Sequence, residues 1–253
     1  MQDEKTPPVI LAAPPSLDVR RHALFLDLDG TLVEFAAHPE QVIASTELRE
    51  LLADLSRAMN GAVALVTGRS IASADAVLDG VLVHIAGIHG FERRAGETTV
   101  RAGGDTSAIS RALKDARSMA ATGALDADIE DKGAALALHY RQTPTAAGGV
   151  RRAAADLAHR HGLSVLEGAM VVELTLGRHT KGDAIADFMS EPPFAGRTPI
   201  AIGDDITDED GFAAVDALGG VSVLVGPVRA TIARWGLPDT RAVMTWLAAA
   251  LTR

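Results

Sequence analysis

The sequence predicts an α/β protein in which a parallel-sheet core, with helices on both faces, carries an inserted smaller α/β domain. Continuous apolar runs that end in polar turns, such as residues 23–26 and 199–203, are typical of strands buried on both faces of a parallel sheet. These runs alternate with stretches of helical periodicity, as in βαβ units. Between two groups of such units, residues 105–174 contain further helical and strand-like stretches, which predict the inserted domain.

The core elements come from both ends of the chain. We expect its strands over residues 23–26, 62–66, 82–85, 199–203 and 221–225. We expect its helices over residues 46–59, 71–78 and 240–251, with Lys181 opening another helix. The predicted core therefore spans residues 21–103 and 178–253.

The inserted domain spans residues 104–177. Its predicted helices cover residues 105–121 and 145–161, and its predicted strands cover residues 134–140, 163–167 and 170–174. A turn at Gly168-Ala169 joins the last two strands. Gly103-Gly104 and Gly177 flank the insert and could serve as hinges for a lid.

Residues 1–20 are predicted to be a flexible tail. Acidic residues come early, and the apolar run over residues 9–13 is too short and too near prolines for a secretory signal.

Composition excludes several classes of function. The formal net charge of -9 and the absence of a Lys/Arg-rich run argue against nucleic-acid and anionic-membrane partners. No apolar stretch approaches the ~20 residues of a membrane span. The chain has no cysteine, which excludes disulfides and thiolate metal sites. We expect a cytoplasmic monomer with an anionic small-molecule substrate.

Two aspartates follow the first apolar run and point to phosphoryl-transfer chemistry. Asp27 and Asp29 enter a Gly30-Thr31 turn, and ligands of open α/β sheets bind beyond the carboxyl ends of strands. One carboxylate can attack phosphorus while the other moves a proton and Mg²⁺ binds nearby. The alternative is a loop with acidic helix caps.

Matching partners follow along the chain. Thr67 ends the second strand with a hydroxyl that can donate to a phosphate oxygen, although it could equally cap the next helix. Lys181 supplies a cation, or is an ordinary surface lysine. The carboxylates of Asp204, Asp205 and Asp208 would repel one another without a cation, although Asp208 also suits a helix N-terminus.

These motifs resemble those of the haloacid dehalogenase superfamily, with its Rossmann-like core, and more closely those of the trehalose-6-phosphate phosphatase family. The segments that carry the closer resemblance are Thr67-Gly68-Arg69, Gly87–Glu92, Glu130–Gly133, Leu138–Arg141, Val171–Glu173 and Gly203–Glu209. Two departures stand out. Thr67 replaces the more usual serine, and Leu174-Thr175-Leu176 stands where the family often has a basic residue and a proline.

The resemblance implies roles for the core residues. Asp27 would be the nucleophile that forms an aspartyl-phosphate, and Asp29 the general acid and base. Lys181 and Thr67 would hold phosphate oxygens. Mg²⁺ would bind Asp27, the backbone carbonyl of Asp29 and Asp204, with Asp205 and Asp208 around these ligands.

Substrate selection is expected in the insert, which would act as a cap. The predicted substrate-binding residues are Asp27, Leu28, Asp29, Thr67, Gly68, Arg69, His89, Glu130, Lys132, Arg141 and Glu173. Spacing alone favours a solvated sheet face for the charged cap residues and a turn residue for His89; the resemblance reverses this preference.

The resemblance implies Mg²⁺-dependent hydrolysis of trehalose-6-phosphate to trehalose and phosphate, the last step of trehalose biosynthesis. One alternative is a phosphatase of another sugar phosphate, such as mannosyl-3-phosphoglycerate. Another is an inactive regulatory domain, although Asp27, Asp29, Lys181 and Asp204 are all present. A trehalose-phosphate synthase is a candidate partner.

Overall fold

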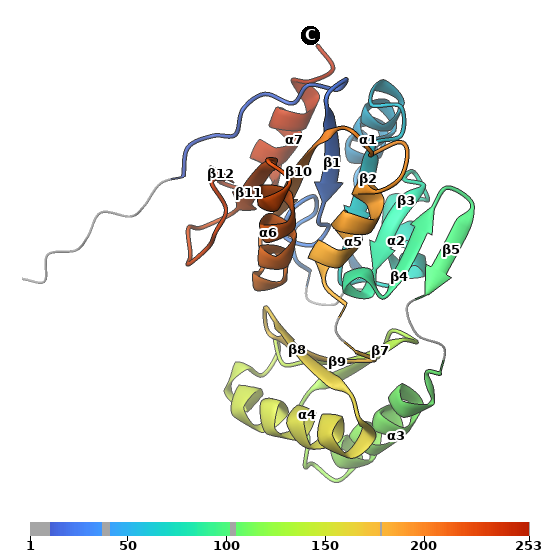
Figure 1. The fold of residues 1–253 in the computed structure, drawn as a ribbon. Coiled ribbons are helices and arrows are strands. Elements are labelled where there is room, and N and C mark those ends of the chain that lie inside the picture. Colours follow the sequence, from blue (N-terminus) through green and yellow to red (C-terminus); the bar gives the residue numbers. More distant parts are fainter. Residues whose placement is uncertain (1–10, 37–40, 102–104, 178, 253) are drawn as a thin grey trace, which may run out of the picture.

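The computed structural model describes residues 11–36, 41–101, 105–177 and 179–252, which form two stacked α/β units (Figure 1). The larger unit contains an eight-stranded sheet and the smaller a four-stranded sheet, counted over the described residues. The chain enters the smaller unit after residue 101 and leaves it before residue 181. The predicted α/β fold class, with its inserted cap, is therefore confirmed.

The core sheet has the strand order β12-β11-β10-β1-β2-β3-β4-β5. Its strands are β1 His22–Leu26, β2 Val63–Val66, β3 His84–Gly87, β4 Glu92–Ala95, β5 Thr98–Arg101, β10 Thr198–Gly203, β11 Val221–Val225 and β12 Trp235–Leu237. Strands β12 to β3 pair in parallel, whereas β4 and β5 are antiparallel additions at one edge. The strands β4, β5 and β12 were not predicted from the sequence.

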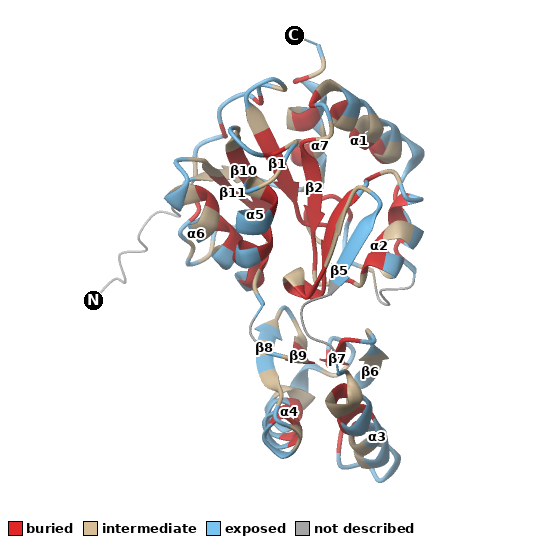
Figure 2. Ribbon diagram, turned by 45° about the vertical axis from the view of Figure 1, so that its right-hand side comes forward, coloured by how far each residue is buried: buried red, intermediate tan, exposed pale blue. Residues whose placement is uncertain are grey.

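Helices cover both faces of this sheet. They are α1 Thr46–Ala58, α2 Ile71–Leu78, α5 Lys181–Met189, α6 Glu209–Ala217 and α7 Thr240–Ala248. Helices α5 and α6 lie on one face, and α1, α2 and α7 on the other (Figures 1 and 2). Helix α1 shows how the local sequence favours a helix at this position. The Ser45 hydroxyl accepts from the Leu48 N–H at 3.2 Å, and Leu48, Leu52 and Leu55 then share one buried face.

The cap is an antiparallel sheet with two helices on the side away from the core. Its strands run in the order β6-β7-β9-β8: β6 Asp128–Asp131, β7 Ala135–His139, β8 Ser164–Gly168 and β9 Val171–Thr175. Helices α3 Ser107–Ala121 and α4 Ala147–His161 cover the outer face (Figure 1). The cap has its own hydrophobic core, separate from that of the larger sheet (Figure 2). The open face of its sheet therefore points toward the core.

The predicted tail is only partly a tail. Residues 1–10 lie outside the described residues, but residues 11–20 pack on the core. The Gly236 N–H donates to the Ala12 carbonyl at 2.9 Å, the Trp246 indole donates to the Pro15 carbonyl at 3.1 Å, and Leu17 is buried. The prediction of flexibility is thus wrong for residues 11–20, because Leu17 joins the hydrophobic core and the carbonyls of Ala12 and Pro15 accept hydrogen bonds from β12 and α7.

The predicted hinge at Gly103-Gly104 lies outside the described residues, as does residue 178. No helix among the residues that the structure describes is long and apolar enough to cross a membrane.

Candidate active site

Three neighbouring parallel strands deliver polar side chains to one edge of the core sheet. Asp27 and Asp29 follow β1, Thr67 follows β2, and Asp204 follows β10. Since β10, β1 and β2 are adjacent and parallel, the residues after them meet at the same carboxyl edge. Lys181 joins them as the first residue of α5. The structure thus gathers these predicted residues at one place.

Lys181 is buried between two carboxylates. Its Nζ lies 2.7 Å from Asp27 Oδ1 and 2.7 Å from Asp208 Oδ1. Burial by itself disfavours the charged ammonium, but the Asp208 and Asp27 carboxylates outweigh it and hold the pKa of Lys181 above its ordinary value. Lys181 is therefore a fixed positive charge in the site.

Asp27, Asp204 and Asp208 form a cluster of carboxylates. One oxygen from each lies within 4.8 Å of the others. Burial, with added repulsion from Asp208 and Asp204, raises the pKa of Asp27 well above its ordinary value even though Lys181 opposes the shift. Burial and the Asp208 charge raise the pKa of Asp204 to about 7. An all-oxygen donor set whose members repel one another fits a hard divalent cation such as Mg²⁺.

Two glycines let these carboxylates approach the strands. A Cβ on Gly30, whose φ is +82°, would lie 2.3 Å from Asp204 Oδ2. A Cβ on Gly203 would lie 2.0 Å from the Asp208 carboxyl carbon. Any side chain at either position would push a carboxylate out of the cluster, so the cluster depends on glycine at both positions.

Asp205 is not one of the three clustered carboxylates, and its predicted place around the metal ligands stays a prediction. Its Oδ2 accepts a hydrogen bond of 3.1 Å from the Ala169 N–H, in the turn between β8 and β9 of the cap. Its own N–H donates to Asp208 Oδ2 at 3.0 Å. The chain turns into the short helix Ile206–Asp208 here, which sends the two carboxylates in different directions. Asp208, predicted to lie around the ligands, is therefore itself in the cluster, and Asp205 contacts the cap.

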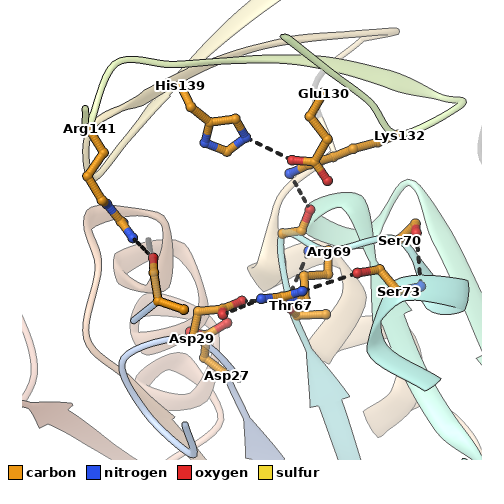
Figure 3. A network of polar contacts seen from close by, with 12 residues as sticks. Asp27, Asp29, Thr67, Arg69, Ser70, Ser73, Glu130, Lys132, His139 and Arg141 are labelled. Atoms are coloured by element: carbon orange, nitrogen blue, oxygen red, sulfur yellow. Dashed lines mark hydrogen bonds and ion pairs between the residues drawn. The ribbon is translucent and has the colours of Figure 1, made fainter. Parts of the chain in front are cut away.

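Arg69 holds Asp29 in a two-pronged ion pair (Figure 3). Its Nε lies 2.6 Å from Asp29 Oδ2 and its Nη2 lies 2.7 Å from Asp29 Oδ1, while Nη1 donates to Ser73 Oγ at 3.2 Å. The planar guanidinium fixes both the position and the orientation of the carboxylate. Arg69, predicted as a substrate contact, therefore also engages the predicted general acid.

His89 lies under the turn that follows β2. Ile88 and His89 both adopt left-handed backbone angles, with φ of 48° and 54°, which is uncommon for residues with a side chain. The His89 N–H donates to the Thr67 carbonyl at 3.0 Å. A Cβ on Gly68 would lie 2.8 Å from the His89 ring, so glycine is needed there. This local strain places a histidine beside the turn that is predicted to bind phosphate, and strained positions often occur at functional sites.

A charge network joins the cap to this turn. Lys132 Nζ donates to the Gly68 carbonyl at 2.8 Å and lies 2.6 Å from Glu173 Oε1. Glu173 Oε2 lies 3.4 Å from His89 Nε2. Burial alone would raise the pKa of Glu173, but Lys132 and His89 outweigh it and the pKa is lowered. The residues Lys132 and Glu173, predicted to bind substrate, thus also connect cap and core.

The other predicted cap residues lie farther along the same face. Glu130 Oε2 is 2.8 Å from His139 Nε2 (Figure 3). Arg141 Nη1 donates to the Ala36 carbonyl at 3.2 Å, and its guanidinium lies 4.5 Å from the centre of the Phe35 ring. His139 was not predicted. Period-two alternation places it on the same face as Arg141, and that signal could have identified it.

A cavity of about 670 Å³ lies between the core and the cap. Its lining includes ten of the eleven predicted substrate-binding residues, namely Asp27, Asp29, Thr67, Gly68, Arg69, His89, Glu130, Lys132, Arg141 and Glu173, and also the predicted Lys181 and Asp205. Leu28 is fully buried and is not among the lining residues, so its contact with substrate stays a prediction. The cavity has a size typical of small-molecule sites, and its polar groups converge from both units.

The sequence of this chain matches one protein family over most of its length. The sequence model of the trehalose-phosphatase family matches residues 25–240. A probable trehalose-phosphate phosphatase from Sinorhizobium fredii is 42% identical over 238 residues, which cover 92% of this chain and 89% of the relative. The trehalose-6-phosphate phosphatase of Escherichia coli K12 is 40% identical over 240 residues, or 94% of this chain and 89% of the relative.

A solved structure agrees with these sequence matches. The crystal structure of a trehalose-6-phosphate phosphatase related protein superposes with a TM-score of 0.76 and 27% identity, and covers 90% of this chain and 96% of that one. The match of fold and the matches of sequence extend over both the core and the cap. This chain therefore belongs to the trehalose-phosphatase family.

Proposed function

We propose that this chain hydrolyses trehalose-6-phosphate to trehalose and phosphate, with Mg²⁺ bound and an aspartyl-phosphate formed on Asp27. Membership of the family makes it a phosphoric monoester hydrolase. One observation carries the finer proposal: Asp27 and Lys181 line the core side of a cavity whose opposite side is formed by charged cap residues. The core side suits a phosphate group, and the cap side suits sugar hydroxyls.

The reaction takes two displacements at phosphorus. In the first, an Asp27 carboxylate oxygen attacks phosphorus, the bond from phosphorus to the sugar oxygen breaks, and Asp29 gives that oxygen a proton. In the second, a water oxygen attacks phosphorus while Asp29 takes a proton from it. The bond between phosphorus and Asp27 then breaks and inorganic phosphate leaves. Asp29 thus acts as acid and then as base.

Fixed charges offset the repulsion between Asp27 and the anionic substrate. Lys181 lies against Asp27 and keeps its positive charge there. Asp27, Asp204 and Asp208, with the predicted carbonyl of Asp29, would hold Mg²⁺, which when bound adds positive charge for the phosphate oxygens. Because such groups are fixed before substrate arrives, they need no reorganisation during the reaction.

The cap residues would select the sugar. Lys132, Glu173 and His89 are buried and pair with one another, so a sugar hydroxyl that enters must exchange hydrogen bonds with them. A site built to hydrogen-bond hydroxyl groups discriminates strongly against ligands that lack them. Glu130 and Arg141 would extend this recognition along the cavity.

Phosphate release from a panel of sugar phosphates, with Mg²⁺ or with a chelator, tests this function. We expect turnover of trehalose-6-phosphate that needs the metal and that Asp27→Asn abolishes while circular dichroism stays unchanged. Asp126→Asn, at an exposed position of the cap, is the matched control and should keep full activity. A folded Asp27→Asn variant that retained more than a few per cent of the activity would rule out the nucleophile.

The panel also separates the alternatives. Preference for mannosyl-3-phosphoglycerate would identify the other sugar phosphatase, and no turnover of any ester would indicate a regulatory domain. A trehalose-phosphate synthase as partner, a monomeric state and a cytoplasmic location stay predictions. Light scattering of the protein alone and mixed with a synthase would test the first two.

A further inference from the structure

An arginine outside the recognised motifs lies against the segment that carries the carboxylate cluster. Arg229 belongs to the loop of residues 226–234 between β11 and β12. Strands β10 and β11 are parallel neighbours, so the segments that follow them lie at the same edge of the sheet. Arg229 Nε donates to the Asp204 carbonyl at 3.2 Å, and its Nη2 donates to the Asp205 carbonyl at 2.6 Å. One guanidinium therefore holds two consecutive backbone carbonyls.

Glu209 fixes this arginine from the other side. Its Oε1 forms an ion pair with Arg229 Nη1, and its Oε2 accepts a hydrogen bond of 2.9 Å from the Ile232 N–H. Glu209 is the first residue of α6 and directly follows Asp208. Arg229 and Glu209 thus tie the loop of residues 226–234 to both ends of the segment that contains Asp204 and Asp208. Both side chains are largely shielded from solvent, with exposed fractions of 30% and 21%.

The segment needs such support because its own side chains repel one another. Asp204 and Asp208 lie with Asp27 in a carboxylate cluster, in which one oxygen of each residue lies within 4.8 Å of the others. Without a cation this repulsion favours separation of the carboxylates. The bonds from Arg229 act on the backbone of Asp204 itself and oppose that separation.

We propose that Arg229 is a positioning residue that holds Asp204 ready for the divalent cation, with Glu209 as its anchor. This inference rests on the proposed function, because it assumes that the carboxylate cluster binds Mg²⁺. Groups that hydrogen-bond to metal-ligating residues commonly change metal affinity by about 10–100-fold when they are removed. Arg229 itself touches neither the cation nor the substrate in this role.

The positive charge of Arg229 and its proposed positioning role predict opposite changes in Mg²⁺ affinity when the side chain is replaced. A positive side chain near the cluster repels a cation, so loss of the charge alone would tighten Mg²⁺ binding. Loss of positioning would weaken it. The direction of the change therefore decides between the two effects.

The test is isothermal titration of MgCl₂ into the full-length, metal-free protein. We expect Arg229→Gln to weaken Mg²⁺ binding by about tenfold. Arg229→Lys keeps the charge and can donate to one carbonyl, so it should recover part of the affinity. Glu209→Gln should weaken binding less than Arg229→Gln, because it removes the anchor but leaves the two carbonyl bonds. Turnover by Arg229→Gln should return toward the wild-type value at saturating Mg²⁺.

Arg234→Gln is the matched control. Arg234 is the last residue of the same loop, is 63% exposed and pairs at 2.9 Å with Asp216, in the last turn of α6. The Mg²⁺ affinity of the Arg234→Gln variant should equal that of the wild type. Should Arg229→Gln lower the melting temperature, the comparison of Arg229→Lys with Arg234→Gln still measures the positioning effect in folded proteins.

The outcomes are distinguishable. Unchanged or tighter Mg²⁺ binding by Arg229→Gln, with normal binding by the wild type, would overturn the positioning role and leave the proposed function intact. Absence of Mg²⁺ binding by the wild type would overturn the cation requirement and this inference with it. Weaker binding by Arg229→Gln with partial recovery by Arg229→Lys supports the proposal.

Discussion

Replacement of Lys181 by methionine should destabilise the metal-free protein strongly. The variant keeps a side chain of similar length but leaves Asp27 and Asp208 without the ammonium that lies 2.7 Å from each. Removing one member of a buried ion pair typically costs about 3–5 kcal/mol of the free energy of unfolding. For a chain of this size each kcal/mol lowers the melting temperature by about 2–4 °C, so the expected loss is about 6–20 °C.

The loss should depend on pH and on metal. Without Lys181, the pKa of Asp27, which burial already raises, rises further, so the folded state holds a proton on Asp27 more tightly than the unfolded chain does. Stability from this group is then lost as pH rises, and the loss of melting temperature should be larger at pH 8 than at pH 6. Mg²⁺ should restore more stability to the variant than to the wild type, because the cation replaces the missing charge.

Differential scanning calorimetry with chelator or with MgCl₂ measures these effects. The control is Lys114→Met, which removes an exposed lysine from α3 and should change the melting temperature by less than about 2 °C. The reasoning is refuted if Lys181→Met melts within about 2 °C of the wild type in chelator, since the two ion pairs would then contribute almost nothing.

The remaining predictions concern the cation, the proton and the sugar. Because the pKa of Asp204 is raised to about 7, the metal-free protein should lose stability as pH rises through about 7. At pH 8, Asp204→Asn should therefore have a higher melting temperature than the wild type. Added Mg²⁺ should not raise the melting temperature of this variant further. Arg69→Gln should slow hydrolysis of trehalose-6-phosphate more than that of para-nitrophenyl phosphate, because a nitrophenolate leaves with little help from the proton of Asp29; equal slowing would exclude a role in proton transfer. Arg141→Ala should lower kcat/KM for trehalose-6-phosphate by a factor that corresponds to about 1–3 kcal/mol of transition-state stabilisation, and should leave kcat/KM for para-nitrophenyl phosphate unchanged. Equal losses on both substrates would show that Arg141 acts through the position of the cap and does not recognise the sugar.

Sequence reasoning predicted the elements whose pattern is strong and local. The apolar runs that became β1, β2, β10 and β11 are buried on both faces, so their composition alone identifies them. Strands β4 and β5 contain Arg93, Arg94 and two threonines, and they lie at the edge of the sheet. Their formation depends on pairing with β3, which no local pattern shows.

In the candidate site too, some positions follow from local sequence pattern and others depend on contacts between distant segments. The positions of Asp27, Lys181 and Asp204 follow from the order of strands, because each ends or begins an element at one edge of the sheet. The contacts of Asp205 depend on how one short helix turns, and its carboxylate reaches the cap. Arg229 carries no motif, and its role appears only when two loops separated by more than twenty residues lie together.

The start of α5, where Lys181 lies, is fixed by contacts within the core. Thr180 and Asp183 form a reciprocal capping box, in which the Thr180 hydroxyl accepts from the Asp183 N–H and the Asp183 carboxylate accepts from the Thr180 N–H. The loop at Gly90 packs so closely on Thr180 that a Cβ there would lie 2.9 Å from its carbonyl oxygen. The first turn of α5 is therefore fixed by contacts within the core, and these contacts keep Lys181 against Asp27. The prediction that the insert acts as a lid then implies that the lid could admit or release a sugar while the charges around Asp27 stay in place.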